Sequence, residues 1–225
     1  MSAHAENNFN LLRLVFALMV VTYHGVILPG APGFASAEGW AAILAEVGVQ
    51  GFFVVSGYLV WSSLERSFSL RLYAEKRVRR LYPAYAAVVI ACAFLALALV
   101  PAARADLAGV ASYLGWNLVF LNFLEPGLPG VFEANRFTEI NGALWTLKIE
   151  VMFYLSVPLI AWAARRYGHA LGFAILYTAS ILYSLLMQHL LESTGREIYG
   201  MLFRQLPGQL TYFVAGMALY HYRDM

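Results

Sequence analysis

Arg13 and His24 are ionisable side chains inside one long apolar stretch. In the hydrocarbon of a bilayer such a group costs several kcal/mol unless it is paired or hydrated, so each is a candidate functional residue. Eleven residues on a helix correspond to a rise of about 16 Å and about three turns. The two side chains then point in directions only about 20° apart. The two side chains therefore share one helical stripe, which favours an interior polar track. The alternative for Arg13 is snorkelling near the cytoplasmic end.

Proton transfer is the chemistry that His24 suggests. Imidazole exchanges protons near neutral pH, so His24 is the best candidate in this chain for a general base that deprotonates a hydroxyl. An interfacial histidine bonded to a neighbouring carbonyl is the alternative. Glu150 lies in a later apolar stretch, near Lys148 and Trp145, and a buried carboxylate there needs a cation or a donor. It either pairs structurally with an arginine or belongs to the site.

Arg77 and Arg80 are three residues apart and would lie on one face of a helix. Two guanidinium groups in this arrangement can grip phosphate oxygens bidentately. A plain positive-inside signal would look the same, and the spacing does not separate the two. Gln50 and Glu46 either line a polar cavity in the second apolar stretch or face water near its outer end. We interpret Ser56-Gly57, in the same stretch, as small residues that allow close helix packing.

The composition is that of an integral membrane protein. Of 225 residues, 61% are apolar and 12% charged, against about 45–50% and about 25% in soluble domains. A mean hydropathy of +0.65 and a net charge of +2 exclude disorder and a nucleic-acid-binding surface. The single cysteine, Cys92, excludes a disulfide framework, and we expect no metal cofactor. We expect His169 in a loop, and His189 and His221 at the membrane interface.

Seven apolar windows are long enough to span a bilayer, and helix is the structure that satisfies the backbone there. The windows are Phe9 to Leu28, Trp40 to Trp61, Leu81 to Val100, Leu107 to Leu124, Ala143 to Trp162, Ala170 to Leu190 and Met201 to Tyr220. No repeat or linker interrupts them. The sequence therefore predicts a single domain over residues 1–225 and an all-α fold. The expected architecture is a polytopic transmembrane helical bundle of about six spans plus one re-entrant or interfacial segment.

Basic residues predict the orientation of these spans. Six of them fall between Ser62 and Leu81, and Arg165 and Arg166 form a second basic turn, so both segments are expected to be cytoplasmic. Both flanks of the Leu107 to Leu124 window then lie outside. Either this window does not cross the membrane or the positive-inside rule fails at one loop, and we favour the non-crossing alternative. The following segment, Glu125 to Asn141, is expected to be an external loop.

Four sequence blocks together resemble the acyltransferase 3 family of membrane O-acyltransferases. The blocks are Arg13-x10-His24, Gly48-Val-x-Gly-Phe-Phe-Val-Val-Ser-Gly-Tyr-Leu, Arg77-x-x-Arg80-x-x-Pro83-x-Tyr85 and Trp145-Thr-Leu-x-x-Glu150-x-x-Phe153-Tyr154. They stand in the family's order and cover most of the chain. The resemblance implies a multi-pass enzyme of the inner (cytoplasmic) membrane. Such an enzyme moves an acyl group, commonly acetyl, from cytoplasmic acyl-CoA to a sugar hydroxyl at the outer face.

The resemblance also implies site residues and partners. His24 and Glu150 would be catalytic, and three arginines would hold the acyl-CoA (acetyl-CoA) donor: Arg13, Arg77 and Arg80. We assign Trp145 and Gln50 to a carbohydrate or glycan acceptor. Membrane lipid is the other expected partner, and no metal or nucleic acid is expected.

Two departures from the family pattern limit these expectations. Ala143 stands where many members have a histidine, and the chain is shorter than most members, so the domain is expected to be truncated at its C-terminus. Direct transfer and a covalent acyl-histidine relay both stay open. A proton-coupled transporter with a relay of Arg13, His24 and Glu150 is the rival from another class, although it predicts an inverted internal symmetry that we do not find. An inactive membrane scaffold is the third alternative.

Overall fold

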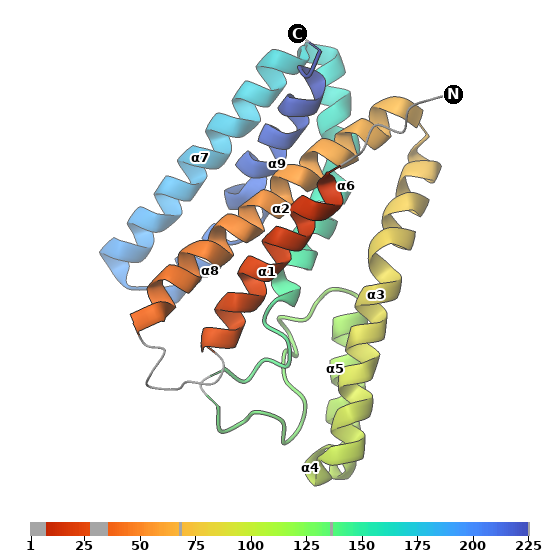
Figure 1. Ribbon diagram of the computed structural model, residues 1–225, viewed down its shortest axis with the longest axis vertical. Helices are drawn as coiled ribbons and strands as arrows, with labels where there is room; N and C mark the ends of the chain where they lie inside the picture. The colour runs from red at the N-terminus through yellow and green to blue at the C-terminus, as the bar shows by residue number, and fades with distance from the viewer. Residues whose placement is uncertain (1–7, 28–35, 68, 136, 225) are drawn as a thin grey trace. The chain divides into compact units, whose positions relative to one another are not determined.

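The computed structural model describes residues 8–27, 36–67, 69–135 and 137–224 (Figure 1). Over these residues the regular structure is helical and no strand occurs. The helices are α1 (Phe9–Ile27), α2 (Glu38–Ser67), α3 (Leu70–Leu99), α4 (Pro101–Ala105), α5 (Leu107–Leu118), α6 (Leu144–Tyr167), α7 (His169–Thr194), α8 (Glu197–Phe203) and α9 (Leu206–His221). The prediction of an all-α fold is confirmed.

Five helices are long and apolar enough to cross a membrane: α1, α2, α3, α6 and α7. Each corresponds to one of the predicted windows. Large apolar side chains on them are widely exposed, with Leu99, Leu155 and Leu182 exposing 73%, 76% and 61% of their surface. Soluble monomers rarely expose apolar surface on this scale, whereas lipid covers it. The chain is therefore a multi-pass membrane protein.

The six basic residues between Ser62 and Leu81 lie in helices and not in a loop. Helix α2 continues to Ser67 and α3 begins at Leu70. The Ser69 hydroxyl caps α3 by accepting a hydrogen bond from the backbone N–H of Leu72 at 3.4 Å. Leu, Ala, Arg, Lys and Glu all favour helix, so the charges that follow Ser69 mark no break in the helix.

The window from Met201 to Tyr220 is also not one helix, because α8 ends at Phe203 and α9 begins at Leu206. Pro207 lies in the first turn of α9, where a residue without an N–H is well tolerated. Gly208 approaches the Phe203 carbonyl so closely that a Cβ would overlap its oxygen. The side-chain amide of Gln209 donates to the same carbonyl at 3.1 Å. These contacts stabilise the break in the helix between α8 and α9.

Contacts between residues divide the chain into two compact units. The first comprises Met1–Arg66 and Leu155–Met225, and it holds α1, α2, α7, α8, α9 and the second half of α6. The second comprises Ser67–Tyr154, and it holds α3, α4, α5 and the first half of α6. The prediction of a single domain over residues 1–225 stays a prediction.

In the first unit, α1 and α2 pack antiparallel. The ring centroids of Phe9 and Tyr58 are 5.0 Å apart, and those of Phe16 and Phe52 are 5.8 Å apart. One turn before Phe52 on α2, a Cβ on Gly48 would come within 2.8 Å of the Phe16 carbonyl oxygen. The absence of a side chain at Gly48 therefore allows the two backbones to approach.

Helices α2 and α9 approach still more closely at two glycines. A Cβ on Gly57 would overlap the carbonyl oxygen of Phe213, and a Cβ on Gly216 would overlap that of Val54. Next to this contact, the rings of Phe53 and Phe213 stack with centroids 4.5 Å apart. The prediction of small-residue packing at Gly57 is confirmed, and it extends to a matching glycine on the partner helix.

In the second unit, the window from Leu107 to Leu124 folds as a short helix followed by a return. Helix α5 has 12 residues, so it rises about 18 Å, while a bilayer core is about 30 Å thick. The chain then comes back to the start of α5, where Pro129 faces Gly109 and Gly130 faces Ala102 of α4. Both flanks of α5 thus lie at the same end of this unit, as a re-entrant segment requires.

The turn after α5 is fixed by buried polar contacts. The Tyr85 hydroxyl of α3 donates to the Asn117 carbonyl at 2.7 Å. The Asn117 side-chain amide donates to the carbonyls of Tyr113 at 2.9 Å and Glu125 at 2.8 Å. The Phe120 ring stacks on Tyr85, with centroids 4.2 Å apart. One asparagine therefore ties the returning chain to the end of α5.

Candidate functional site

Arg77 and Glu150, predicted from separate sequence blocks, are brought together through Tyr154. The Tyr154 hydroxyl donates a short hydrogen bond to Glu150 Oε1, one turn earlier on α6. The Arg77 guanidinium carbon lies 5.6 Å from the centre of the Tyr154 ring and 5.8 Å from that of Tyr73. Both distances are within the range of a cation–π interaction. All four residues belong to the second unit.

A backbone feature of α6 explains why Tyr73 lies beside Tyr154. Pro158 has no N–H, so it cannot donate the helical hydrogen bond to the Tyr154 carbonyl four residues earlier. The Tyr73 hydroxyl donates to that carbonyl at 2.9 Å and replaces the missing bond. Tyr73 is buried, with 4% of its surface exposed. The proline thus creates an acceptor that anchors α3 against α6, and the same tyrosine forms one wall around Arg77.

The arginines of α3 have different surroundings. Arg77 is half-buried between two aromatic rings. Arg80 is exposed, yet it lies within electrostatic reach of Tyr154. Arg79 is also exposed and pairs with Glu75 at 2.6 Å. A simple positive-inside signal requires only solvated charges, so the position of Arg77 favours a specific role for that residue.

Trp145 and Lys148 lie in the first turns of α6, and both are half-buried. The Lys148 ammonium lies 4.9 Å from the centre of the Phe123 ring, in the segment that follows α5. The Asn141 side chain accepts the backbone N–H of Ala143 at 3.1 Å and so orders the residues that lead into α6. Trp145 thus lies at the start of the helix that carries Glu150.

His24 lies in the last turn of α1, where its Nδ1 is 2.8 Å from the Val20 carbonyl oxygen. A carbonyl only accepts, so Nδ1 carries the hydrogen in this bond. The neutral ring then keeps its lone pair on Nε2. The Tyr23 ring meets the imidazole edge-on, with centroids 5.3 Å apart. His24 is thus bonded through Nδ1 to a carbonyl of its own helix, which leaves Nε2 for other contacts. The catalytic role of His24 stays a prediction.

Arg13 and Gln50 belong to the first unit together with His24. Arg13 lies on α1 and is half-buried, on the same helix as His24. Gln50 lies on α2 and donates its side-chain amide to Glu46 Oε1 at 2.9 Å. Gln50 and Glu46 therefore bond to each other. The proposed contact of Gln50 with an acceptor stays a prediction.

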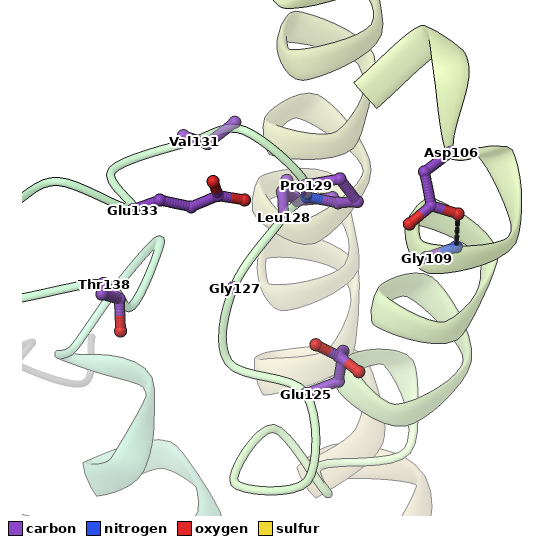
Figure 2. Close-up of a pocket in the computed structure, with 9 residues that line it drawn as sticks. All are labelled: Asp106, Gly109, Glu125, Gly127, Leu128, Pro129, Val131, Glu133 and Thr138. Carbon is purple, nitrogen blue, oxygen red and sulfur yellow. Dashed lines mark hydrogen bonds between the residues drawn. The ribbon is translucent and has the colours of Figure 1, made fainter. Parts of the chain in front are cut away.

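A polar pocket of about 330 Å³ opens in the second unit between the start of α5 and the segment that returns to it (Figure 2). Carboxylates of Asp106, Glu125 and Glu133 line it together with Thr138. Asp106 accepts the backbone N–H of Gly109 at 2.9 Å, and Glu133 accepts that of Gly130 at 2.7 Å. Its volume is within the range of small-molecule sites.

The profile of a family described as an acyltransferase domain matches residues 6–225. The chain belongs to this acyltransferase family. The resemblance inferred from the four sequence blocks is therefore confirmed over nearly the whole chain. No solved protein structure matches the chain significantly.

Several known proteins are similar to this chain. Nodulation protein 10 of Rhizobium leguminosarum bv. viciae is 29% identical over 84% of the chain and 53% of its own length. An O-acetyl transferase of Shigella phage Sf6 is 31% identical over 79% of the chain and 52% of its own length. A peptidoglycan O-acetyltransferase of Listeria monocytogenes is 29% identical over 65% of the chain and 22% of its own length. The chain thus spans about half the length of the first two relatives.

Sequence reasoning about this acyltransferase-family chain did not assign roles to Tyr73 and Tyr154. Tyr154 is the last residue of the Trp145 block. It follows Glu150 by four residues, and this spacing predicts a contact between the two side chains on a helix. Tyr73 lies 81 residues from its acceptor. Pro158 was the available signal, because a proline inside a helix leaves a carbonyl that needs another donor.

Proposed function

We propose that this chain forms the membrane part of an O-acyltransferase of the inner (cytoplasmic) membrane. It moves an acyl group, with acetyl as the first candidate, from cytoplasmic acyl-CoA to a sugar hydroxyl at the outer face. Family membership and the O-acetyltransferase names of two relatives support this proposal. The observation that carries it is the placement of Arg77 against Tyr154 and its Glu150 partner, since it joins two of the family-like blocks in one site.

Donor binding is the role proposed for the arginines. Acyl-CoA is a polyanion at its nucleotide end, and Arg77 and Arg80 on one face of α3 suit its phosphates. The rings of Tyr73 and Tyr154 limit the orientations of the Arg77 guanidinium before the donor arrives, which lowers the entropy lost on binding. Arg13 marks the path of the uncharged pantetheine arm.

Proton transfer from the acceptor is the role proposed for His24. Its Nε2 takes the proton of the sugar hydroxyl while that oxygen attacks the thioester carbonyl. The carbon–sulfur bond then breaks, and the CoA thiolate leaves and takes up the proton from the imidazolium. Glu150 is proposed to orient the acceptor, and Trp145 and Gln50 are proposed to bind it.

Thioester consumption by the purified chain tests this proposal. The parent chain in detergent, incubated with acetyl-CoA and a mixture of candidate glycans, should release free CoA and incorporate acetyl. His24→Gln should lower turnover by about 10²–10⁴-fold, the usual contribution of one general base. His189→Gln changes an exposed histidine of α7 and should be without effect. Equal turnover of the parent and His24→Gln would refute the role of His24, and a folded parent that consumes no thioester would favour the transporter or scaffold.

Donor affinity tests the arginines separately. Lysine preserves the charge but lacks the planar fork, so Arg77→Lys with Arg80→Lys should weaken acyl-CoA binding by about 10- to 100-fold, the value of a charge-assisted hydrogen bond of about 1.5–3 kcal/mol. Arg79→Lys is the matched control because Arg79 pairs with Glu75 on the surface. Unchanged affinity in the double variant would mean that these charges only orient the helix.

A further inference from the structure

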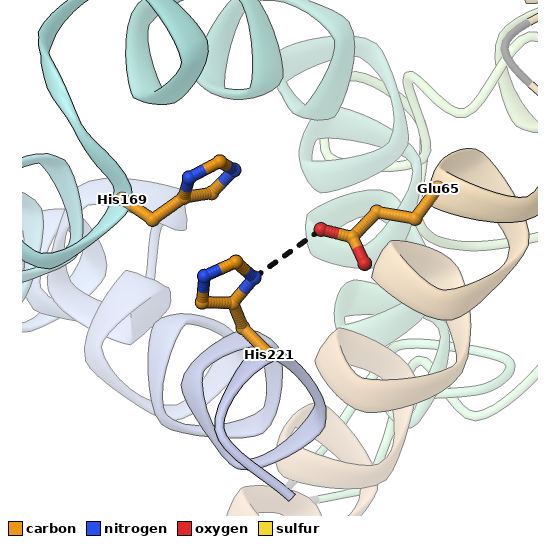
Figure 3. A group of neighbouring side chains, drawn as sticks. All are labelled: Glu65, His169 and His221. Atoms are coloured by element: carbon orange, nitrogen blue, oxygen red, sulfur yellow. Dashed lines mark hydrogen bonds and ion pairs between the residues drawn. The ribbon is translucent and has the colours of Figure 1, made fainter. Parts of the chain in front are cut away.

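Three helix ends of the first unit bring together one carboxylate and two imidazoles (Figure 3). Glu65 comes from the last turns of α2, His169 is the first residue of α7, and His221 is the last residue of α9. One potential ligand atom from each residue lies within 4.8 Å of the other two. The expectation that His169 lies in a loop is wrong, because the helix begins at that residue.

Direct contacts hold the three side chains of this cluster together. His221 Nδ1 lies 3.4 Å from Glu65 Oε1, and the two imidazole rings stack with centroids 4.1 Å apart and planes 16° apart. Trp61 donates its indole N–H to the same Glu65 oxygen at 2.9 Å. A neutral imidazole nitrogen and a carboxylate oxygen are both groups that bind metal ions.

The surroundings are those of a shielded but reachable site. The Phe173 ring meets His169 and His221 edge-on, each with centroids 6.0 Å apart. The side chains of Glu65 and His221 expose 29% and 27% of their surface. Arg165 acts electrostatically on His169, and the Glu65 carboxylate offsets this positive charge. An ion can therefore enter from water and lose part of its hydration shell at the cluster.

We propose that Glu65, His169 and His221 bind one zinc-like divalent ion. A His₂Glu set suits Zn²⁺, which binds nitrogen and oxygen at about 2.0–2.2 Å in tetrahedral geometry. Ligand atoms around such an ion are about 3.3 Å apart, so side-chain rotations suffice to close the observed separations. Water would take the fourth position. The Trp61 bond to Glu65 supplies the outer contact that orients a ligand. The ion would fasten the ends of α2, α7 and α9, independently of the proposed acyl transfer.

Metal binding by the intact chain tests this proposal. The parent, purified in detergent with any affinity tag removed, should bind one Zn²⁺ per chain and unfold at a higher temperature when Zn²⁺ is present. Its Co²⁺ form should show the intense visible absorption of tetrahedral coordination. His169→Ala, His221→Ala and Glu65→Gln should each lose at least about 10- to 100-fold in affinity, the loss seen when even an outer contact is removed. His189→Ala is the matched control on α7 and should bind like the parent.

A second measurement needs no variant to fold. Zn²⁺ should protect His169 and His221 of the parent from carbethoxylation by diethyl pyrocarbonate, with His189 as an internal control that reacts equally in both conditions. Absence of saturable Zn²⁺ binding by the folded parent would overturn the proposal. Binding that survives all three substitutions, that requires His189, or that leaves His169 and His221 unprotected would overturn it as well.

Discussion

Replacement of Tyr73 by phenylalanine tests whether the helical hydrogen bond that Pro158 cannot make explains the contact between α3 and α6. The substitution removes one hydroxyl and keeps the ring that lies beside Arg77. The Tyr154 carbonyl would then lose the hydroxyl donor that stands in for its helical bond. A buried polar group left without a partner costs about 1–3 kcal/mol, so we expect Tyr73→Phe to lower the free energy of unfolding by that amount.

Tyr73→Phe should lower the free energy of unfolding by less in a variant in which α6 can form the missing helical hydrogen bond. Pro158→Ala restores a backbone N–H four residues after Tyr154, and this N–H can donate to the carbonyl. In the Pro158→Ala background, Tyr73→Phe should therefore cost less than about 1 kcal/mol. The difference between the two costs is a coupling energy, and it isolates the hydroxyl–carbonyl bond from other effects of either substitution.

Unfolding of the parent, the two single variants and the double variant in mixed micelles, followed by circular dichroism, measures this coupling. Tyr82→Phe is the control because Tyr82 lies on the same helix and is 40% exposed; it should change the free energy of unfolding by less than about 0.5 kcal/mol. Equal costs of Tyr73→Phe with and without Pro158 would refute the reasoning, since the hydroxyl would then not replace the helical bond.

Two further predictions concern packing and topology. Gly57→Ala should lower the free energy of unfolding by about 1–3 kcal/mol, because its methyl group overlaps a carbonyl of α9. Gly25→Ala, with no atom within 4 Å, should raise it by up to about 1 kcal/mol; thermal unfolding compares the two, and similar shifts would contradict the packing. In a Cys92→Ala background, Ala105→Cys and Ala134→Cys are exposed positions on the two flanks of α5 and should both react with an impermeant maleimide from one side of the membrane. Reaction from opposite sides would show that α5 crosses.

Hydropathy predicted the long helices because twenty apolar residues in sequence satisfy both the bilayer and the helix. It did not predict their ends. Helix α3 begins at Leu70, well before its apolar window, since charged residues with high helix propensity follow the Ser69 cap. The break before α9 depended on Pro207 and the close approach of Gly208 to Phe203, which a hydropathy average does not register.

The candidate site was predictable only where its residues are near in sequence. The stripe of Arg13 and His24 follows from helical geometry. The placement of Arg77 beside Tyr154 joins α3 to α6 and depends on tertiary packing. Likewise Glu65 and His221 are 156 residues apart, and they meet because the ends of α2 and α9 converge in the first unit. No spacing rule connects such residues before the fold is known.

The shortness of α5 has a consequence for how the chain enters the membrane during synthesis. A segment of 12 residues is too short to leave the translocon as a separate span. It must therefore pack against a helix that is already in place. Helix α3 has been synthesised by then, and its residues Tyr85 and Val89 share a core with Val110 and Tyr113 of α5. Substitutions in this core would act before the protein is complete. Their first sign would be misinsertion and degradation of the nascent chain, with normal specific activity in the molecules that survive.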